Sequence, residues 1–171
     1  KDDIHKLLDA AAEEYSVYAP VEGAAGPEFR IISPESEILF DYTNVEMSPK
    51  GIFFPQTETL CDFDYDTIED IPVPEGDILV WRSRPCDALA LTYLDEIFSE
   101  ENKGYDDPYY MNRRRGSVMI SLACNVPCAT CFCSSVDGGP ASTKGSDIIA
   151  TELNGELLLT AVTEGDRKST R

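Results

Sequence analysis

The stretches Asp77-Ile-Leu-Val-Trp-Arg-Ser83 and Ser117-Val-Met-Ile-Ser-Leu-Ala123 are short apolar runs that predict two buried β-strands. Between them, Asp87 to Phe98 carries its apolar residues at helical spacing and predicts a helix. Asp107 to Arg115 predicts a second, shorter helix that ends at Gly116. The order strand, helix, helix, strand is typical of a crossover unit, so we expect the two strands to be parallel.

Short strands are predicted on both sides of this central unit, and one helix is predicted at the start of the chain, from Asp2 to Glu14. The expected strands are Tyr15–Ala19, Phe29–Ile32, Ile38–Tyr42, Leu60–Tyr65, Asp147–Leu153 and Glu156–Val162. The last two should form a hairpin around Asn154-Gly155, the strongest turn signal in the chain. Phe29–Ile32 and Ile38–Tyr42 are expected to pair as a second hairpin, and Thr67–Gly76 reads as a surface connection.

These elements predict an α+β or α/β fold, with a mixed sheet, a few short helices and a cysteine loop at the strand ends. The length of 171 residues favours a single domain over residues 1–171. Because the chain begins at Lys1 without a methionine, a removed leader and a fragment of a longer subunit are both open interpretations.

The composition is strongly acidic, with 32 acidic and 14 basic residues and a net charge of −18. Such a surface repels phosphate backbones, which argues against nucleic-acid binding. Solubility, a docking face for a basic partner and a high-salt environment each explain the charge. No apolar run reaches the length of a membrane span, so we expect no membrane segment.

Six cysteines are present, and four of them lie within a short run. They are Cys61, Cys86, Cys124, Cys128, Cys131 and Cys133. Neighbouring cysteines in one short loop cannot all reach good disulfide geometry. The crowding instead suits metal ligation in a reducing compartment, and we therefore expect a cytoplasmic protein.

Two of the cysteine positions follow the two strongest predicted strands. Cys124 comes directly after Ser117–Ala123, and Cys86 follows Asp77–Ser83. If those strands are neighbours, their ends converge and the loop from Cys124 to Cys133 can wrap a metal centre. Small residues in and after this loop leave backbone N–H groups free to donate to cluster sulfurs, which tunes the reduction potential.

An iron–sulfur cluster needs about four thiolates, and close spacings are typical of a loop that folds around it. Zinc is the alternative, although zinc ligands usually come as two separated pairs rather than one run and a distant cysteine. The spacing therefore favours iron and sulfide. A redox dithiol at Cys128-Ala-Thr-Cys131 is a weaker interpretation. Cys61 lies in a predicted strand and is expected to be a buried apolar residue.

The spacing Cys124-x-x-x-Cys128-x-x-Cys131 is also that of radical enzymes that cleave S-adenosylmethionine. Those enzymes build a large barrel after the motif, whereas only about forty residues follow Cys131 here. Thr130 also stands where an aromatic residue is usual. We therefore set this interpretation aside.

Three stretches together resemble the N-terminal region of the iron–sulfur beta subunits of sulfhydrogenases and the related A subunit of anaerobic sulfite reductase. They are Ser48-Pro-Lys-Gly-Ile-Phe-Phe-Pro-Gln-Thr-Glu58, Arg84-Pro-Cys-Asp-Ala-Leu-Ala90, and the segment from Asp107-Pro-Tyr-Tyr110 to Thr130-Cys-Phe-Cys-Ser-Ser135 with Gly138-Gly-Pro140. Asp147-Ile-Ile-Ala-Thr-Glu-Leu153 also fits. The resemblance spans nearly the whole chain and is firmest from position 48 onward.

The resemblance implies an electron-transfer subunit of an anaerobic redox complex that carries a four-iron (4Fe–4S) cluster. The implied ligands are Cys86, Cys124, Cys131 and Cys133, with Cys128 ranked fifth because the family does not require a cysteine there. Ferredoxin-like or flavin-containing subunits are the implied partners. The family continues into a ferredoxin-like region with two further clusters, and that cysteine set is missing here, so a fragment or a separate ferredoxin subunit is implied.

The remaining chemistry-bearing residues favour structural roles. His5 is the only histidine and lies on the predicted first helix, so a serine-type triad is excluded and a surface role is expected. Arg113-Arg-Arg115 would stabilise a helix C-terminus, offset the charge of a cluster or meet an acidic partner, and Asp87 would be a helix N-cap. No catalytic residue is predicted. The function is then an electron relay, with a zinc-stabilised interaction module as the alternative.

Overall fold

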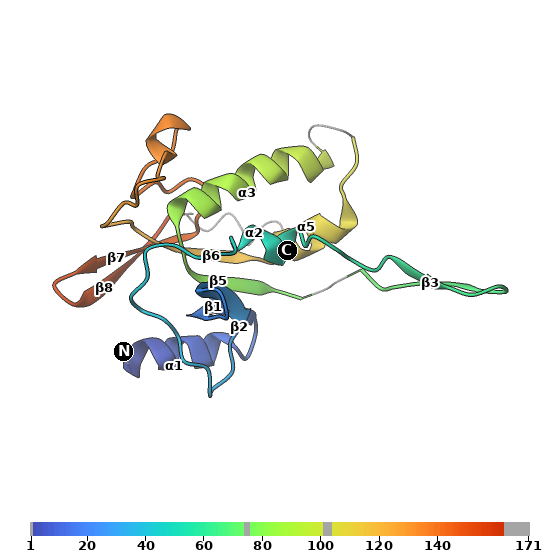
Figure 1. Cartoon of the computed structure of the whole chain (residues 1–171), viewed down its shortest axis with the longest axis horizontal. Helices are drawn as coiled ribbons and strands as arrows, with labels where there is room; N and C mark the ends of the chain where they lie inside the picture. The colour runs from blue at the N-terminus through green and yellow to red at the C-terminus, as the bar shows by residue number, and fades with distance from the viewer. Residues whose placement is uncertain (1, 74–75, 101–103, 163–171) are drawn as a thin grey trace.

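The computed structural model describes residues 2–73, 76–100 and 104–162, and its centre is a six-stranded mixed sheet (Figure 1). The strand order is β2-β1-β5-β6-β7-β8. The strands are β1 (Ser16–Glu22), β2 (Pro27–Ile31), β5 (Ile78–Ser83), β6 (Val118–Leu122), β7 (Ile148–Leu153) and β8 (Glu156–Ala161). The inner pairs are parallel and the outer pairs β1–β2 and β7–β8 are antiparallel, which confirms the predicted mixed sheet with short helices.

The predicted crossover unit is confirmed. From β5 the chain enters α3 (Pro85–Phe98), continues through α5 (Pro108–Arg115) and returns as β6, parallel to β5. All six residues of β5 are buried, as expected for a central strand covered on both faces. Asp107 caps α5 by accepting a hydrogen bond from Tyr110 N at 2.9 Å, and Gly116 follows the helix as predicted.

Helices cover both faces of the sheet. Figure 1 shows α1 (Asp2–Ala11) on one side and α3 on the other, with α2 (Lys50–Phe53) and α5 on the α3 side. Alternate residues of the strands feed the two cores, because successive strand side chains point to opposite faces. The α1 core contains Leu8, Val17, Ala19, Ile38, Leu79, Trp81, Ile120, Leu122 and Ala150. The α3 core contains Phe53, Ile78, Val80, Ala88, Leu91, Tyr110, Met111 and Met119.

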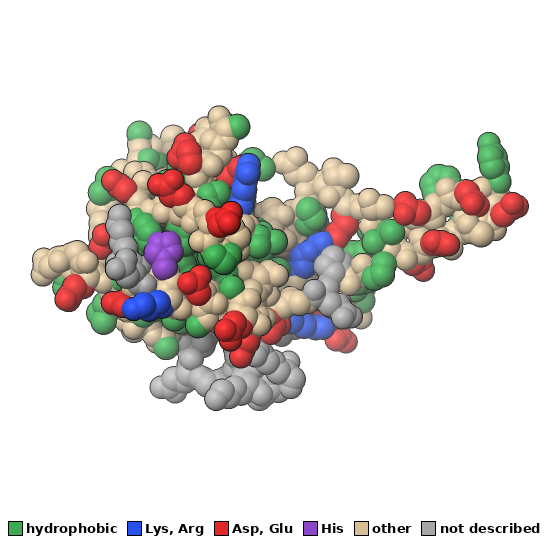
Figure 2. Space-filling view, turned by 90° about the horizontal axis from the view of Figure 1, so that it is seen from below, with side chains coloured by type: hydrophobic (Ala, Val, Ile, Leu, Met, Phe, Trp, Pro, Cys, Tyr) green, Lys and Arg blue, Asp and Glu red, His purple; other side chains and the backbone are tan. Residues whose placement is uncertain are grey.

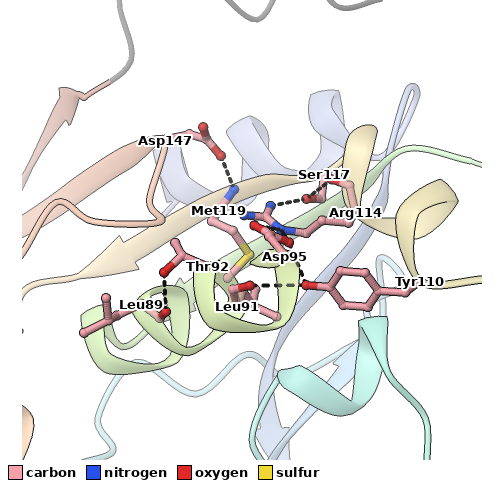
Figure 3. A network of polar contacts seen from close by, with 9 residues as sticks. All are labelled: Leu89, Leu91, Thr92, Asp95, Tyr110, Arg114, Ser117, Met119 and Asp147. Carbon is pink, nitrogen blue, oxygen red and sulfur yellow. Dashed lines mark hydrogen bonds and ion pairs between the residues drawn. The ribbon is translucent and has the colours of Figure 1, made fainter. Parts of the chain in front are cut away.

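A polar network fixes the crossover against the sheet (Figure 3). Arg114 Nε donates to Asp95 Oδ1 at 2.9 Å, and Tyr110 Oη donates to the same oxygen at 2.7 Å. Arg114 Nη1 also donates to Ser117 Oγ, so α3, α5 and the start of β6 are tied together. Burial and the Asp95 carboxylate raise the pKa of Tyr110 far above its usual value, which keeps the phenol a donor.

The three successive arginines of α5 all have carboxylate partners. Arg113 pairs with Glu58, Arg114 with Asp95 and Arg115 with Asp106. These pairs occupy the side chains at the helix C-terminus, where cations are also favoured by the helix dipole.

The predicted strand Ile38–Tyr42 and its hairpin with Phe29–Ile32 are wrong. β2 pairs with β1 instead, and Ile38 makes only a single bridge to Val21. The physical reason lies in the carbonyl groups of this segment. Those of Phe40 and Tyr42 accept hydrogen bonds from buried arginine side chains, so they are not available to a strand ladder.

The predicted buried position of Cys61 is also wrong. Cys61 is exposed on β3 (Cys61–Phe63), which pairs only with β4 (Ile68–Asp70) in a hairpin that projects from the body (Figure 1). β4 lies within the predicted connection Thr67–Gly76, of which residues 74–75 lie outside the described residues. Across the parts of the chain that are described, no helix is long and apolar enough to span a membrane.

Candidate metal centre

The cysteine run begins where β6 ends, at the carboxyl edge of the parallel strands. Cys124 follows the strand after one residue, and its N–H donates to Pro140 O at 2.7 Å, which closes the loop from 124 to 140 at its base. The chain then reaches β7 through Asp147, whose Oδ2 accepts from Met119 N at 2.7 Å (Figure 3). The loop is therefore anchored to the sheet at both ends.

The loop lies over the first half of α3, as Figure 1 shows. Two glycines permit this close approach. A Cβ at Gly145 would overlap the backbone carbonyl of Ala88, and φ at Gly145 is +76°, a conformation that favours glycine. A Cβ at Gly138 would lie 3.0 Å from Leu89 Cδ2. These contacts place the segment after the cysteine run against the helix whose first turn carries Cys86.

Cys86 and Cys133 lie on the two sides of the contact between the loop and α3. Cys133 lies in the short 3-10 helix η1 (Cys133–Ser135), and a Cβ at Gly138 would touch both Cys133 and Leu89 of α3. Desolvation, followed by the neighbouring Asp87 carboxylate and then Cys133, raises the pKa of Cys86 to about 11. The free thiol is thus protonated at neutral pH, and metal binding there would release a proton.

Cys128 and Cys131 form a pair of thiols in direct contact. Their sulfurs are 3.1 Å apart, and Cys128 N–H donates to Cys131 Sγ at 3.1 Å. Hydrogen bonds from Thr130 and then Cys131 lower the pKa of Cys128 to about 7, so thiolate is accessible near neutrality. Two sulfurs on one tetrahedral ion lie about 3.8 Å apart, given metal–sulfur bonds of about 2.3 Å. The pair therefore needs only a small adjustment to share a metal ion.

Cys124 lies at the base of the loop, where its Sγ is 3.4 Å from Val126 O. Within the described ranges no three Cys, His, Asp or Glu side chains converge as a ready-made metal site. Four of the five predicted ligands lie in this loop and the fifth, Cys86, lies in the first turn of α3, whereas Cys61 lies apart on β3. Binding of a cluster would require these thiols to close further.

Asp87 does not serve as the predicted helix N-cap. The N-cap of α3 is Arg84, and Asp87 is the third helical residue, whose Oδ2 accepts from Arg84 N at 3.3 Å. Its Oδ1 accepts from Ser48 Oγ at 2.9 Å. The carboxylate therefore joins the segment at Ser48 to the helix end that carries Cys86.

Two buried arginines beside the site were missed by the sequence interpretation. Arg82 and Arg84 are only 3 % and 8 % exposed, and φ at Arg82 is +63°, which is strained for a non-glycine residue. They line a hollow of about 120 Å³ together with Asn125 of the cysteine loop. The nearest carboxylate to Arg82 is Glu152, at 4.0 Å. The signal was present in the sequence, since Arg82 interrupts an otherwise apolar strand.

One of these arginines is close to the proposed ligands in the chain. Arg84 precedes Cys86 by two residues, and Asn125 adjoins Cys124. The Arg84 guanidinium itself points to the carbonyl groups of Tyr42 and Thr43, so it fixes the backbone next to the helix end that carries Cys86.

No protein-family model matches the chain, and neither the curated proteins nor the solved structures include a match to it. The resemblance to the sulfhydrogenase beta subunits thus rests on the sequence motifs alone.

Proposed function

We propose that the chain binds an iron–sulfur cluster through its cysteine loop and Cys86, and transfers electrons as a subunit of an anaerobic redox complex. One observation carries the proposal. The segment that follows the cysteine run packs against the first half of α3, whose first turn carries Cys86, so five of the six cysteines, all of them free thiols, lie in elements at the carboxyl edge of the sheet. A single tetrahedral metal ion binds four thiolates, so a set of five cysteines suits a centre with several iron ions.

The donor set fits such a group. Thiolates are soft ligands that select iron–sulfur clusters and zinc, and the only histidine, His5, lies on α1, away from this loop in the chain. When bound, the cluster would supply one-electron chemistry. The protein would hold it by sulfur and donate backbone N–H groups such as that of Cys128.

The proposed ligands remain Cys86, Cys124, Cys131 and Cys133, with a four-iron cluster. Because Cys128 contacts Cys131, Cys128 could replace one of these four cysteines as a cluster ligand. Both residues are on the accessible side of the loop, where Cys131 and the neighbouring Phe132 are exposed. An exposed edge suits electron exchange with ferredoxin-like or flavin-containing partner subunits in a reducing, cytoplasmic setting.

A zinc-stabilised interaction module is the second candidate function. The Cys128–Cys131 contact favours this function, because zinc sites are commonly built from pairs of closely spaced cysteines. In that case the chain would carry no electrons, and the loop would be a structural element for binding a partner.

The test is elemental analysis of the chain purified without oxygen. We expect iron and acid-labile sulfide in similar amounts, and a visible absorption band that is lost on reduction. Cys131→Ser should lose most of the iron, whereas the matched control Cys61→Ser, on the exposed β3, should retain it. Stoichiometric zinc without sulfide would overturn the iron–sulfur proposal in favour of the interaction module.

A further inference from the structure

The hairpin of β3 and β4 projects from the body of the molecule as an arm, which we define as residues 60–71 (Figures 1 and 2). All residues from 61 to 70 are exposed. At the root of the arm, Glu58 is fixed by its ion pair with Arg113 of α5. The arm thus leaves a defined point on the crossover unit and contributes nothing to either core.

The arm presents apolar side chains to solvent. Phe63 and Ile68 face each other across the two strands and are 80 % and 76 % exposed. Tyr65, at the tip, is fully exposed. Cross-strand partners share one face of an antiparallel pair, so Phe63 and Ile68 form one apolar patch. Exposed aromatic anchors of this kind are the residues that dominate binding energy in protein interfaces.

The tip is ordered by its own hydrogen bonds. Asp64 Oδ1 accepts from Asp66 N and Thr67 N, both at 2.8 Å, and from Thr67 Oγ1 at 3.1 Å. These bonds fix the turn that carries Tyr65, so the tip is pre-organised. A two-stranded hairpin with no core beneath it is marginally stable in water, which indicates that the arm is completed by another surface.

The negative charge of the arm indicates which kind of partner surface it fits. The arm carries five carboxylates, and the chain has no Lys, Arg or His between Lys50 and Arg82. Asp62 and Glu69 lie directly opposite each other, and like charges in that position destabilise a strand pair. Figure 2 shows the acidic groups alternating with apolar ones along the arm. Cations supplied from outside would relieve the Asp62–Glu69 repulsion while apolar contacts cover Phe63 and Ile68.

We propose that the arm docks into an apolar groove rimmed by Lys and Arg on a partner protein. A second copy of this chain is a poor occupant, because its net charge of −18 would repel the acidic arm. The proposal names the surface through which the proposed redox subunit would join its complex, but the arm contains none of the proposed cluster ligands. It therefore stands or fails separately from the cluster.

The first part of the test places a photo-reactive phenylalanine analogue at Tyr65 of the full chain, in cells of its source. A second chain carries it at Tyr105, an exposed control tyrosine outside the arm. We expect one protein to cross-link at position 65 and not at position 105. Identical products at both positions, or a cross-linked dimer of this chain, would overturn the proposal.

The second part uses that cross-linked protein in purified form and measures its affinity by calorimetry. Phe63→Ser should weaken binding about tenfold or more, while Leu158→Ser, an exposed apolar position on β8, should not. Glu69→Lys should protect the arm amides from hydrogen exchange, by placing a cation opposite Asp62, and yet weaken binding. Asp9→Lys on α1 makes the same charge change as a control.

These outcomes separate the two proposals. The arm variants should keep the iron content of the parent chain, and Cys131→Ser should keep the affinity for the partner. Equal affinity of the parent and the Phe63→Ser chain would contradict docking through the arm, whatever the metal content.

Discussion

Arg84 combines several contacts at the carboxyl edge of the sheet. It is the N-cap residue of α3, its Nε donates to Thr43 O at 3.0 Å, and its guanidinium lies 4.8 Å from the centre of the Tyr42 ring. A second donor bond goes to Tyr42 O. Arg84 therefore fixes residues 42–43 against the helix that carries Cys86, and charged hydrogen bonds of this kind are the strong ones.

We expect Arg84→Met to lower the free energy of unfolding by about 3 kcal/mol, because it removes two charged hydrogen bonds to part-buried carbonyls. Urea denaturation of the metal-free chain measures this. The control Arg30→Met removes an arginine whose side chain is 63 % exposed, so its effect should stay below about 1 kcal/mol. Equal losses for the two variants would contradict the structural role of Arg84.

Serine substitutions rank the proposed ligands. Cys131→Ser and Cys133→Ser should abolish or convert the cluster, and Cys128→Ser should have the smallest effect among the cysteines of the run. Cys61→Ser should leave the cluster intact, since Cys61 is exposed on β3. Iron and sulfide content per chain is the measurement. Loss of all iron in Cys61→Ser, with none lost in Cys133→Ser, would show that the ligand assignment is wrong.

Among the elements, the cysteine loop depends on its contact with α3. Gly145→Ala should destabilise the chain by about 2–5 kcal/mol, through both an unfavourable positive φ and an overlap with Ala88 O. It should also lower the iron content. Gly155→Ala is the matched control, because φ there is +80° but no atom lies within 4 Å of the added Cβ. If both variants behave alike in stability and iron content, loop packing does not position the site.

The tip of the arm should respond to pH through Asp64. Its hydrogen bonds from Asp66 N and Thr67 N lower the pKa of its carboxyl group below the ordinary value of 3.8. Because the folded-state pKa is lowered, these bonds stabilise the turn fully at pH values above the ordinary carboxyl pKa. The stabilisation is lost as the pH falls through the folded-state pKa.

Amide exchange at Asp66 and Thr67 should therefore accelerate only at pH below that ordinary carboxyl value, after correction for intrinsic exchange rates. Asp64→Asn keeps a side-chain acceptor without the titration, so its tip should show no such transition. NMR exchange measurements on both chains provide the comparison, and a transition of equal size in Asp64→Asn would contradict the assignment.

The regular elements were the more predictable part of the fold. Asp77–Ser83 and the helix after it have an unambiguous apolar pattern, and Asn154-Gly155 specifies its hairpin through turn chemistry. Ile38–Tyr42 has an equally strand-like composition. Its backbone carbonyls accept from Arg82 and Arg84 instead, a long-range contact that no local pattern contains.

The candidate site was predictable in its residues and not in its arrangement. Sequence spacing placed Cys86 and Cys124 at the ends of neighbouring strands, and the parallel pairing of β5 with β6 agrees with this. Cys61 was misjudged because strand composition does not reveal whether a strand has a core beneath it. The Cys128–Cys131 contact depends on a local loop conformation, which spacing alone does not determine.

For the whole molecule, the net charge of −18 should control encounters with redox partners. Reduction of the proposed cluster by a cationic viologen radical should slow as salt rises, because screening shortens to about 8 Å at physiological ionic strength. Reduction by dithionite, an anion, should accelerate over the same range. Stopped-flow absorbance measures both rates, and salt effects of the same sign would contradict electrostatic steering.

The central claim is that the loop from Cys124 to Cys133 and Cys86 hold an iron–sulfur cluster. Electron paramagnetic resonance of the chain, purified without oxygen and then reduced by one electron, tests it most directly. We predict a low-temperature cluster signal that integrates to about one spin per cluster, is retained in Cys61→Ser and is lost or altered in Cys131→Ser. A silent spectrum from a chain that holds one zinc ion and no sulfide would contradict the claim.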